Sequence, residues 1–406
     1  MILGAMIAWF WWAVLALAAI GTLASTVYLG MVLVAAWRFL RRPRPAHRDA
    51  PLPPVSVVKP LCGAEPRLEA NLESFFLLDY PAYEILFAMR SPEDGALPAV
   101  EALHCKYPRV PVQVIFSGEP RHANPKVTSL EAMIAAARHD IVVISDSDIR
   151  VAPDFLRQVV PPLHDAKTGL VTCLYRGVPT RSFWSRLEAL ELSVELPSGV
   201  LVADMLEGMK FALGAVMATR KDVLRAIGGI GIAGDYYSDD FVLGNLVAAA
   251  GYRVELSSYL AEHVLSDETF SSCFRRQLRW NRSTRYSRPK GHLGTGLTFA
   301  MPYGILGAIA GIALGRPGLG LALLVFAALR SLVQGLAIGG AVLKLRDFFA
   351  EAVLYAAHDL IGFAAWVGSF TGREFRWRGA RYSFGPGGRV ERHAPAREVS
   401  KENLSL

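Results

Sequence analysis

Two aspartates follow a strongly apolar stretch of the chain. The segment "DIVVISDSDIRV", Asp140 to Val151, is a run of β-formers that ends in Asp146, Ser147 and Asp148. Carboxylates one residue apart at the end of a buried strand can hold Mg²⁺ or Mn²⁺, which prefer oxygen ligands and commonly bind through carboxylates plus substrate phosphates. The alternative is a turn in which the aspartates accept bonds from local backbone amides. Taken alone, the triplet favours the turn.

Further polar residues change that balance. The segments "RSPEDGA", "ANPKVTSL", "YYSDDFVLG" and "RRQLRW" supply, in order, Asp94, Lys126, Asp239 with Asp240, and Gln277 with Arg279 and Trp280. Each has a simpler explanation: Asp94 as a loop residue, Asp239 as a helix cap and Arg279 as a solvated or lipid-facing charge. These explanations do not account for the occurrence of all of them in one chain. We therefore expect the acidic motifs to form a substrate site.

The segment from Pro51 to Lys290 alternates strand-like and helix-like pieces that would position these residues. Short runs rich in Val and Ile predict strands over 54–61, 83–90, 110–118, 140–146 and 169–177. Helix-spaced apolar residues predict helices over 66–78, 95–107 and 127–138. The alternation predicts an α/β fold with a mostly parallel sheet covered on both faces. Ligands of such sheets bind beyond the carboxyl ends of the strands, where Asp94, Lys126 and Asp146 would gather.

The N-terminal segment 1–37 carries no charged side chain and no histidine. The chain is 52% hydrophobic and only 19% charged, which is too apolar for an ordinary soluble protein. Since ~20 apolar residues cross a bilayer, we expect residues 1–37 to form a transmembrane helix; a signal peptide would have a basic start and a shorter apolar core. Residues 38–54 are a basic, proline-rich linker. Because basic flanks stay in the cytoplasm, residues 55–290 should form a cytoplasmic domain.

Three C-terminal segments also bear on the membrane. Residues 293–343 are uncharged apart from Arg316 at a tight connection and Arg330, and they predict a transmembrane hairpin in which Arg330 should face protein, water or a lipid headgroup. The apolar stretch 348–370 carries a weakly polar stripe, and the arginines that follow it oppose the positive-inside tendency. Spanning and interfacial placements of this stretch both remain open. Residues 371–406 read as a basic tail.

Charge and cysteine content restrict the partners. The net charge is +7, and residues 275–290 alone contain seven cationic side chains and no acidic one. Such a stretch beside a membrane segment indicates an anionic lipid surface rather than nucleic acid. The four widely spaced cysteines suggest neither a zinc site nor a disulfide framework. Residues 187–213 predict two short helices divided by Pro197, which either pack on the sheet or lie in the membrane interface.

The motifs resemble those of a known family. Asp94, Asp146-Ser147-Asp148, Asp240 and the group of Gln277, Arg279 and Trp280 resemble the Asp, Asp-x-Asp, Asp, (Gln/Arg)-x-x-Arg-Trp pattern of membrane glycosyltransferases with the A-type nucleotide-sugar fold. The segments "VSVVKPLCG", "NPKV", "DSDIRV", "GLVTCLYRG" and "WRGARYSF" are similar to ceramide glucosyltransferases and to the hopanoid-associated glycosyltransferases. The resemblance covers most of the chain from Val55 to Phe384. It implies an A-type α/β domain flanked by transmembrane helices.

The resemblance also implies roles for the site residues. Asp94 would contact the nucleoside of a UDP-sugar, and Asp146 and Asp148 would hold the Mg²⁺ or Mn²⁺ that bridges the diphosphate. Lys126 would lie against the phosphates or the substrate pocket. Asp240 would be the general base, because the family pattern aligns it with the second member of an acidic pair, although the local sequence leaves Asp239 open. Gln277, Arg279 and Trp280 would close the acceptor side and help the diphosphate leave.

The implied activity is a hexosyl transfer from a UDP-sugar to the hydroxyl of a membrane lipid with inversion at the anomeric carbon, with glucose as the sugar and ceramide as the lipid. A hopanoid-lipid glycosyltransferase would keep every motif and change only the acceptor. A processive polysaccharide synthase shares the acidic motifs but usually needs more membrane spans. A lipid-binding scaffold without activity is the non-enzymatic alternative. The resemblance places the protein in a bacterial inner membrane, with the catalytic domain in the cytoplasm.

Overall fold

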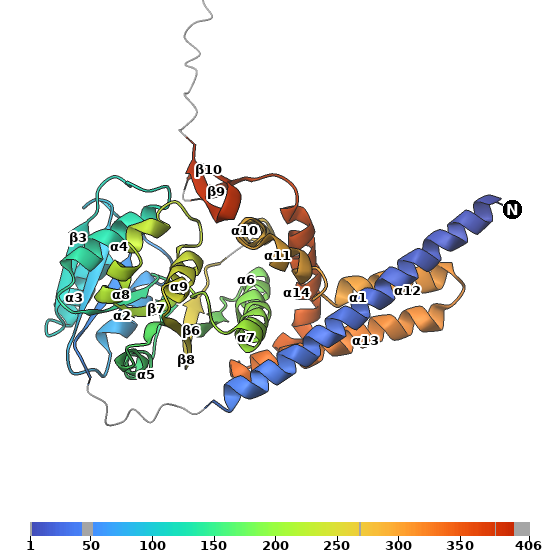
Figure 1. Cartoon of the computed structure of the whole chain (residues 1–406), viewed down its shortest axis with the longest axis horizontal. Coiled ribbons are helices and arrows are strands. Elements are labelled where there is room, and N and C mark those ends of the chain that lie inside the picture. Colours follow the sequence, from blue (N-terminus) through green and yellow to red (C-terminus); the bar gives the residue numbers. More distant parts are fainter. Residues whose placement is uncertain (1, 43–51, 268, 378, 394–406) are drawn as a thin grey trace, which may run out of the picture.

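The computed structural model describes residues 2–42, 52–267, 269–377 and 379–393. Most of the predicted linker 38–54 and the end of the predicted tail 371–406 lie outside these residues. Figure 1 shows an α/β part beside a group of long helices, with a small sheet next to both. The helix α1 (Ile2–Leu40) and the C-terminal helices form the long-helix group.

The central sheet has eight strands in the order β3-β2-β1-β4-β7-β6-β8-β5. The strands are β1 (Val55–Pro60), β2 (Tyr83–Met89), β3 (Val112–Phe116), β4 (Ile141–Ser145), β5 (Ile149–Arg150), β6 (Thr168–Val178), β7 (Val216–Arg220) and β8 (Arg253–Val264). Strands β3, β2, β1 and β4 are mutually parallel, β6 pairs with β8 in parallel, and β7 and β5 run antiparallel to their neighbours. The prediction of an α/β fold with a mostly parallel sheet is therefore confirmed.

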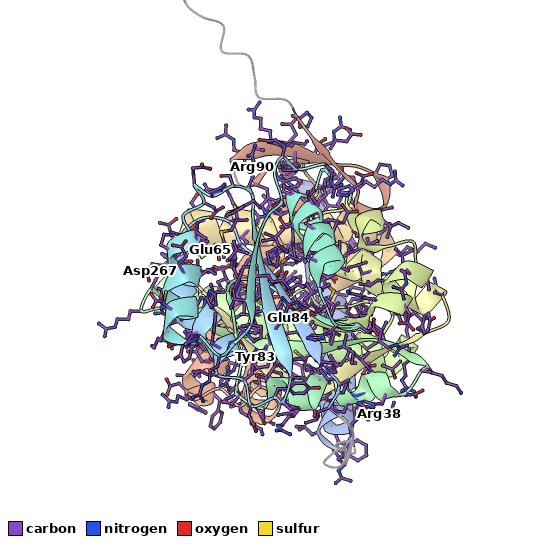
Figure 2. All side chains as sticks on the ribbon, turned by 90° about the vertical axis from the view of Figure 1, so that its left-hand side faces the viewer. Arg38, Glu65, Tyr83, Glu84, Arg90 and Asp267 are labelled. Carbon is purple, nitrogen blue, oxygen red and sulfur yellow. The ribbon has the colours of Figure 1, made fainter. Side chains whose placement is uncertain are left out.

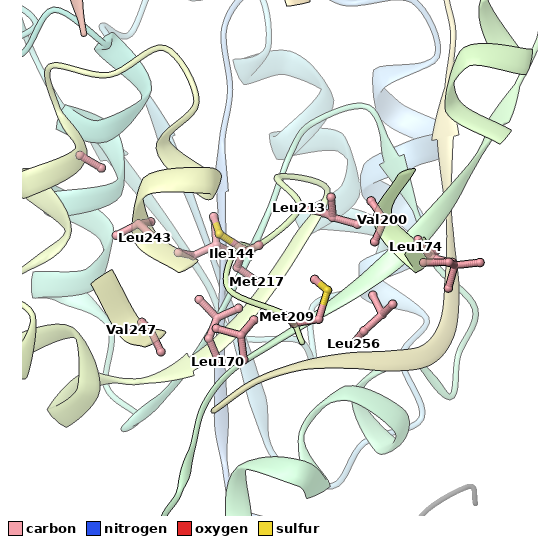
Figure 3. Close-up of a cluster of buried hydrophobic side chains, with 14 of the residues drawn as sticks. Ile144, Leu170, Leu174, Val200, Met209, Leu213, Met217, Leu243, Val247 and Leu256 are labelled. Carbon is pink, nitrogen blue, oxygen red and sulfur yellow. The ribbon is translucent and has the colours of Figure 1, made fainter. Parts of the chain in front are cut away.

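Alternate residues of the buried strands enter two separate hydrophobic clusters, one on each face of the sheet. In β4, Val142 and Ile144 join one cluster, whereas Ile141 and Val143 join the other. Figure 3 shows part of the first cluster, in which Ile144 and Met217 lie close to side chains from the surrounding helices. The sheet is therefore buried on both sides, as its near-continuous apolar strands predict.

Helices cover both faces of the sheet. They are α2 (Leu68–Phe76), α3 (Leu97–Lys106), α4 (Pro125–Ala136), α5 (Phe155–Val159), α8 (Lys221–Ala226) and α9 (Asp239–Ala249). In α2, Leu68, Leu72 and Phe75 are buried at helical spacing, as the sequence predicts. The short 3-10 segments η2 (Pro161–His164) and η4 (Ile230–Ala233) complete this part of the chain.

The segment 187–213 forms a helical layer between the sheet and the membrane helices. It consists of α6 (Phe183–Leu190), a π-helical segment η3 (Glu191–Glu195) and α7 (Leu196–Glu207). Pro197 does not divide this layer, because Leu190, Glu195 and Leu196 all have right-handed helical dihedrals and η3 continues directly into α7. The backbone N–H that proline lacks is thus lost within a continuous helix, next to its π-helical turn. Leu187, Leu190 and Val194 lie in the hydrophobic core, so this face packs within the protein.

Within the described residues, three helices are long and apolar enough to cross a membrane: α1, the segment Pro317–Val342 and α14 (Phe348–Ser369). The second consists of α13 (Pro317–Gly335) and a π-helical segment η5 (Leu336–Val342). The first arm of the predicted hairpin differs from expectation, because it is split into α11 (Pro289–Thr295) and α12 (Met301–Ala313). With 13 residues, α12 is about 20 Å long, which is shorter than the bilayer core of about 30 Å.

The segment that follows α14 is not simply a basic tail. A three-stranded antiparallel sheet consists of β9 (Glu374–Trp377), β10 (Ala380–Phe384) and β11 (Val390–Arg392), with a 3-10 turn η6 (Pro386–Gly388) before β11. Phe375, Phe384 and Val390 form its small core. Figure 1 shows this sheet above α10 (Phe270–Ser287). The C-terminal sheet thus returns the chain to the α/β part.

Candidate functional site

A buried lysine of the neighbouring strand donates a hydrogen bond to the Asp-x-Asp turn. Lys59, in β1, is fully buried, and its Nζ donates to the Asp146 carbonyl at 2.7 Å and lies 3.3 Å from Ser145 Oγ. Its ammonium also lies 3.6 Å from the centre of the Phe75 ring. Burial lowers the pKa of Lys59 to about 7, while the nearby aspartates oppose this shift. The sequence signal for Lys59 is a lone charge inside an apolar strand.

A second lysine joins the two acidic motifs. Lys126 Nζ lies 2.7 Å from Asp146 Oδ1 and 3.3 Å from Asp239 Oδ2. Burial alone would lower the pKa of Lys126, but the Asp146 and Asp239 carboxylates outweigh it and raise this pKa. The lysine is therefore a stable cation between two carboxylates that are far apart in sequence.

The beginning of α4 positions this lysine. Asn124 is the N-cap, and its Oδ1 accepts a bond from the Lys126 backbone N–H at 3.1 Å. The other side of the same amide donates to the Tyr236 carbonyl at 3.0 Å and to Asp239 Oδ1 at 3.4 Å. Pro125 occupies the first turn, which suits its fixed φ. The "NPK" segment therefore ties the start of α4 to the loop before α9.

The two acidic residues at the start of α9 have different surroundings. Asp239 is buried and engaged by Lys126 and Asn124. Asp240 is half-buried; its Oδ1 accepts from the Phe241 backbone N–H at 2.8 Å. A Cβ on Gly214 would lie 3.0 Å from Asp240 Oδ2 and 3.6 Å from Asp146 Oδ2. Both carboxylates therefore border the same small space, which a side chain at position 214 would fill.

The charge of Asp240 is costly in this place. Burial, followed by repulsion from Asp239, raises its pKa to about 6, and attraction to Lys126 limits the shift. A carboxylate with a pKa near 6 is mostly ionised at neutral pH and binds a proton more readily than an ordinary aspartate. Those are properties of a general base.

Asp148 and its neighbours form an oxygen-rich group suited to a divalent cation. Asp148 Oδ1 is buried and has no hydrogen-bond partner among the described residues, while its Oδ2 lies 3.3 Å from His263 Nε2. Next to it, Ser147 Oγ donates to Glu65 Oε2 at 2.6 Å. A buried carboxylate oxygen without a partner is rare and indicates an absent ligand. The donor set of Asp146 and Asp148 fits Mg²⁺ or Mn²⁺, and the His263 ring lies beside it.

Asp94 lies where its strand predicts, beyond the carboxyl end of β2. Figure 2 shows Tyr83 and Glu84 toward one end of β2 and Arg90 beyond the other, on the side where the C-terminal sheet lies. Asp94 Oδ1 accepts bonds from the backbone N–H groups of Gly63 at 2.8 Å and Ala96 at 2.9 Å. Asp94 therefore joins the loops after β1 and β2. Its contact with a nucleoside remains a prediction.

The α10 motif requires a correction of spacing. In the pattern (Gln/Arg)-x-x-Arg-Trp the first residue stands three positions before the arginine, and that position is Arg276 and not Gln277. Positions 276, 279 and 280 share one face of α10, whereas Gln277 is turned away by about 100° from Arg276. Arg276 Nη1 lies 2.9 Å from Oε1 of the fully buried Glu188. Gln277 is buried, and its Oε1 has no hydrogen-bond partner among the described residues.

Arg279 is connected to the α9 loop through Tyr237. Its Nε donates to Tyr237 Oη at 2.6 Å, and its guanidinium lies 5.8 Å from the centre of that ring. The Tyr237 ring in turn packs edge-on against Phe375, Trp377 and Phe384 of the C-terminal sheet, with ring centres 5.3–5.6 Å apart. The C-terminal sheet therefore fixes Tyr237, two residues before Asp239. The sequence singles out "WRGARYSF" only by resemblance.

Tyr175, near the end of β6, is a further residue that sequence reasoning missed. Its ring lies 5.7 Å from that of His263 and packs beside Trp280 and Leu192. Burial and the surrounding carboxylates, with Asp240 the largest of these, raise its pKa. Tyr175 therefore lies between the acidic residues of the sheet edge and the α10 motif.

Several arginines of the basic stretch 275–290 bind protein groups rather than lie free. Arg282 donates to the carbonyls of Glu374 at 2.7 Å and Thr371 at 2.8 Å, and Arg285 donates to the Ser369 carbonyl. These bonds hold the end of α14 and the start of the C-terminal sheet against α10. The contact with an anionic lipid surface stays a prediction, and it concerns the remaining basic residues of this stretch.

An eight-stranded α/β sheet with paired carboxylates at its edge, joined to membrane helices, defines a membrane glycosyltransferase domain of the A type. The chain belongs to glycosyl transferase family 21, whose sequence model matches residues 17–390. The match includes every residue of the site described above, the segment Pro317–Val342, α14 and the part of α1 from residue 17 onward.

Curated proteins and solved structures support this assignment. Ceramide glucosyltransferase 1 of Caenorhabditis elegans is 30% identical over 257 residues, which are 63% of this chain and 55% of that protein. A ceramide glucosyltransferase of Komagataella phaffii is 33% identical over 147 residues, or 34% of this chain and 29% of that protein. The chain thus spans about half the length of the Caenorhabditis relative it matches.

Among solved structures, a mannosyltransferase of Pyrobaculum calidifontis, in complex with GDP-Man and Mn²⁺, has a TM-score of 0.50 at 20% identity. The alignment covers 86% of this chain and 99% of that one. At this level of identity the likeness concerns the fold, and it agrees with the A-type α/β architecture.

Proposed function

We propose that the protein transfers a hexose from a UDP-sugar to the hydroxyl of a membrane lipid, with inversion at the anomeric carbon. The observation that carries this proposal is the cluster of Asp146, Lys126, Asp239 and Asp240 at the sheet edge. A nucleotide sugar needs cationic groups for its diphosphate and a base for its acceptor, and this cluster offers both within one small volume. Two of its relatives are named as ceramide glucosyltransferases, which supports glucose and ceramide as the substrates.

The diphosphate would lie against Lys126 and the Asp146–Asp148 turn. A divalent cation held by Asp146 and Asp148 would neutralise charge on the departing UDP. The solved mannosyltransferase contains Mn²⁺ with its nucleotide sugar, which supports a divalent ion in the same fold. Lys126, already a stable cation between two carboxylates, would keep a positive charge beside the leaving group.

Asp240 would take the proton of the acceptor hydroxyl. As the lipid oxygen forms a bond to the anomeric carbon, the bond from that carbon to the UDP oxygen breaks, and the hydroxyl proton passes to an Asp240 carboxylate oxygen. One displacement inverts the carbon. Asp239 is less suited to this role, because Lys126 and Asn124 already engage its oxygens. Arg279 and Trp280 would border the acceptor side, together with Arg276 in place of Gln277.

The membrane helices agree with a lipid acceptor. The π-helical segment η3 contacts both β6 of the sheet and the candidate membrane span α14, and the amphipathic helix α10 also packs on α14. The basic residues after α1 and α13 support a cytoplasmic placement of the α/β domain, as in a bacterial inner membrane.

The test is transfer by purified full-length protein in detergent, with labelled UDP-glucose, UDP-galactose or UDP-N-acetylglucosamine, ceramide or a hopanoid alcohol, and Mg²⁺ or Mn²⁺. Formation of glucosylceramide would support the proposal. Transfer only to the hopanoid would change the acceptor, and a polymeric product would favour the processive synthase. UDP-sugar binding without any transfer would refute the proposal. Absence of UDP-sugar binding would also refute it and would favour the lipid-binding scaffold.

A further inference from the structure

A second polar cluster lies on the membrane side of the site, apart from the aspartates. It consists of Glu191 and Glu195 of η3 and His358 of α14, whose ligand atoms all lie within 4.8 Å of one another. His358 Nε2 lies 2.9 Å from Glu195 Oε2 and 3.2 Å from Glu191 Oε2, and the imidazole is fully buried. Two carboxylates four residues apart on one helix repel each other, and the histidine between them offsets only part of this repulsion.

The local backbone is built to bring these groups together. The π-helical geometry of η3 sets Glu191 and Glu195 toward α14, and π-helical turns occur frequently at functional sites. Gly362 of α14 permits the close approach, because a Cβ there would lie 3.0 Å from Glu195 Oε2. The two helices therefore meet at this cluster without an intervening side chain.

One carboxylate oxygen of the cluster lacks a donor. An imidazole Nε2–H points toward one acceptor, and the shorter distance goes to Glu195. Glu191 Oε2 is buried and has no hydrogen-bond partner among the described residues. A buried acceptor of this kind is expensive to leave unpaired. The Glu191 and Glu195 side chains retain 14% and 22% exposure, so a small polar group can reach them.

Further buried polar groups with unused atoms continue from the cluster into the membrane helices. The Tyr355 ring stacks on His358, and Tyr355 Oη accepts a bond from Gln334 Nε2 at 3.1 Å. Gln334 is 1% exposed, and its Oε1 has no partner among the described residues. Arg330 donates to the carbonyls of Ser25 and Thr298, while its Nη1 is likewise buried without a partner in the described chain. The polar groups therefore extend from the membrane helices to η3.

The other face of η3 borders the proposed acceptor side of the active site. Leu192 and Leu196, each next in sequence to a cluster glutamate, pack with Trp280 and Tyr175. Besides burial, the charges of Asp240 and Glu191 both raise the pKa of Tyr175, so this tyrosine is near both the cluster and the proposed catalytic carboxylates.

We infer that Glu191, Glu195 and His358 form the binding site for the polar head of the lipid acceptor, which they recognise through adjacent hydrogen-bond donors such as a hydroxyl and an amide N–H. The inference rests on the proposed function and specifies its acceptor. Carboxylates accept such bonds, and a charged acceptor makes them stronger than neutral ones. Ceramide presents this combination of donors, whereas diacylglycerol presents a single hydroxyl and no amide N–H.

A bound transition metal is the competing occupant, because one histidine and two carboxylates can also ligate Zn²⁺. Metal-bound histidines generally donate their other ring N–H to a protein group. His358 Nδ1 is buried and has no hydrogen-bond partner among the described residues. The surroundings of His358 therefore favour a lipid head over a metal.

The experiment compares the wild-type protein with Glu191→Gln, which keeps the shape and removes the charge, and with Glu73→Gln as a matched control. Like Glu191, Glu73 is a helical glutamate that pairs with a basic side chain, here Lys106, but it lies on α2. Transfer from UDP-glucose is measured with short-chain ceramide and with short-chain diacylglycerol. Binding of a fluorescent short-chain ceramide is measured without donor, and metal content is determined by mass spectrometry.

We expect Glu191→Gln to raise the KM for ceramide about tenfold, the difference between a charged and a neutral hydrogen bond, with an unchanged KM for UDP-glucose. Its preference for ceramide over diacylglycerol should shrink, and Glu73→Gln should behave as wild type. Unchanged ceramide binding would overturn the inference, as would equal losses for donor and acceptor. Stoichiometric metal in the wild type that is lost in Glu191→Gln would assign the cluster to a metal. If the wild type binds ceramide in a Glu191-dependent manner and yet transfers no glucose to it, that result would refute only the proposed function.

Discussion

Replacing Asp240 by asparagine should separate catalysis from stability. The Asp240 pKa rises from 3.8 to about 6 in the folded protein, and each unit corresponds to about 1.4 kcal/mol. A carboxyl with a raised pKa stabilises the fold fully below its unfolded pKa, and this contribution is lost as the pH rises through about 6. At pH 7 the ionised Asp240 therefore costs about 2 kcal/mol, after allowance for partial exposure.

Asp240→Asn removes this charge and the proton acceptor together. We expect transfer to ceramide to fall by 10²–10⁴-fold, the usual contribution of a general base, while the melting temperature in detergent rises by a few degrees. UDP binding should be retained. The measurement combines product formation, thermal unfolding and UDP titration on the same preparation.

The matched control is Asp239→Asn. Asp239 is buried and engaged by Lys126 and Asn124, so the substitution leaves the Lys126 ammonium with one carboxylate fewer. It should lower the melting temperature, in contrast to Asp240→Asn. The reasoning is refuted if Asp240→Asn keeps more than about a tenth of the wild-type rate, or if it melts below the wild type.

Three further outcomes are expected. Asp148→Ala, or chelation of divalent ions from the wild type, should weaken UDP-sugar binding at least tenfold, and added Mn²⁺ should restore only the chelated wild type; binding that persists in chelator would contradict the cation site. The kcat/KM for the acceptor should decline as the pH falls below about 6, because Asp240 becomes protonated; a flat profile between pH 5 and 7 would exclude it as the base. Phe384→Ala should cost about 3–5 kcal/mol within the C-terminal sheet and reduce transfer through Tyr237, which limited proteolysis and activity assays can follow; a normal rate with a cleaved C-terminal sheet would show that the sheet is dispensable.

The local signals in the sequence predicted the parallel strands β1 to β4 and β6, but not β8, which pairs in parallel with β6. Strand β4 lies within the predicted strand 140–146, and Asp146 follows it at the sheet edge. These features depend on hydrophobic periodicity over a few residues, which the sequence carries directly. The antiparallel strand β7 between β4 and β6 was not predicted, because its place is set by pairing with residues that are 45 to 79 positions away.

The candidate site likewise combines features that the local sequence predicts with features that depend on contacts between distant segments. The types and spacing of the acidic residues predict them as site residues. Their shared contact with Lys126 depends on the packing of the N-cap of α4 against the loop before α9. The signal for Lys59 is only a lone charge inside an apolar strand, and His263 is one of several polar residues of β8, so the local sequence does not distinguish it. The spacing of the motif and the helical periodicity of α10 both favour Arg276 over Gln277 beside Arg279 and Trp280.

The helix α1 has 39 residues and is therefore about 58 Å long, about twice the thickness of a bilayer core. Its last turns, including Val32 and Phe39, share one hydrophobic core with Val58 and Ile144 of the sheet and with Val342 after α13. The helix α1 therefore packs directly against the α/β part of the protein. Under the proposed function, this packing sets the position of the site relative to the membrane segment, and the thickness of the surrounding bilayer should affect the transfer rate.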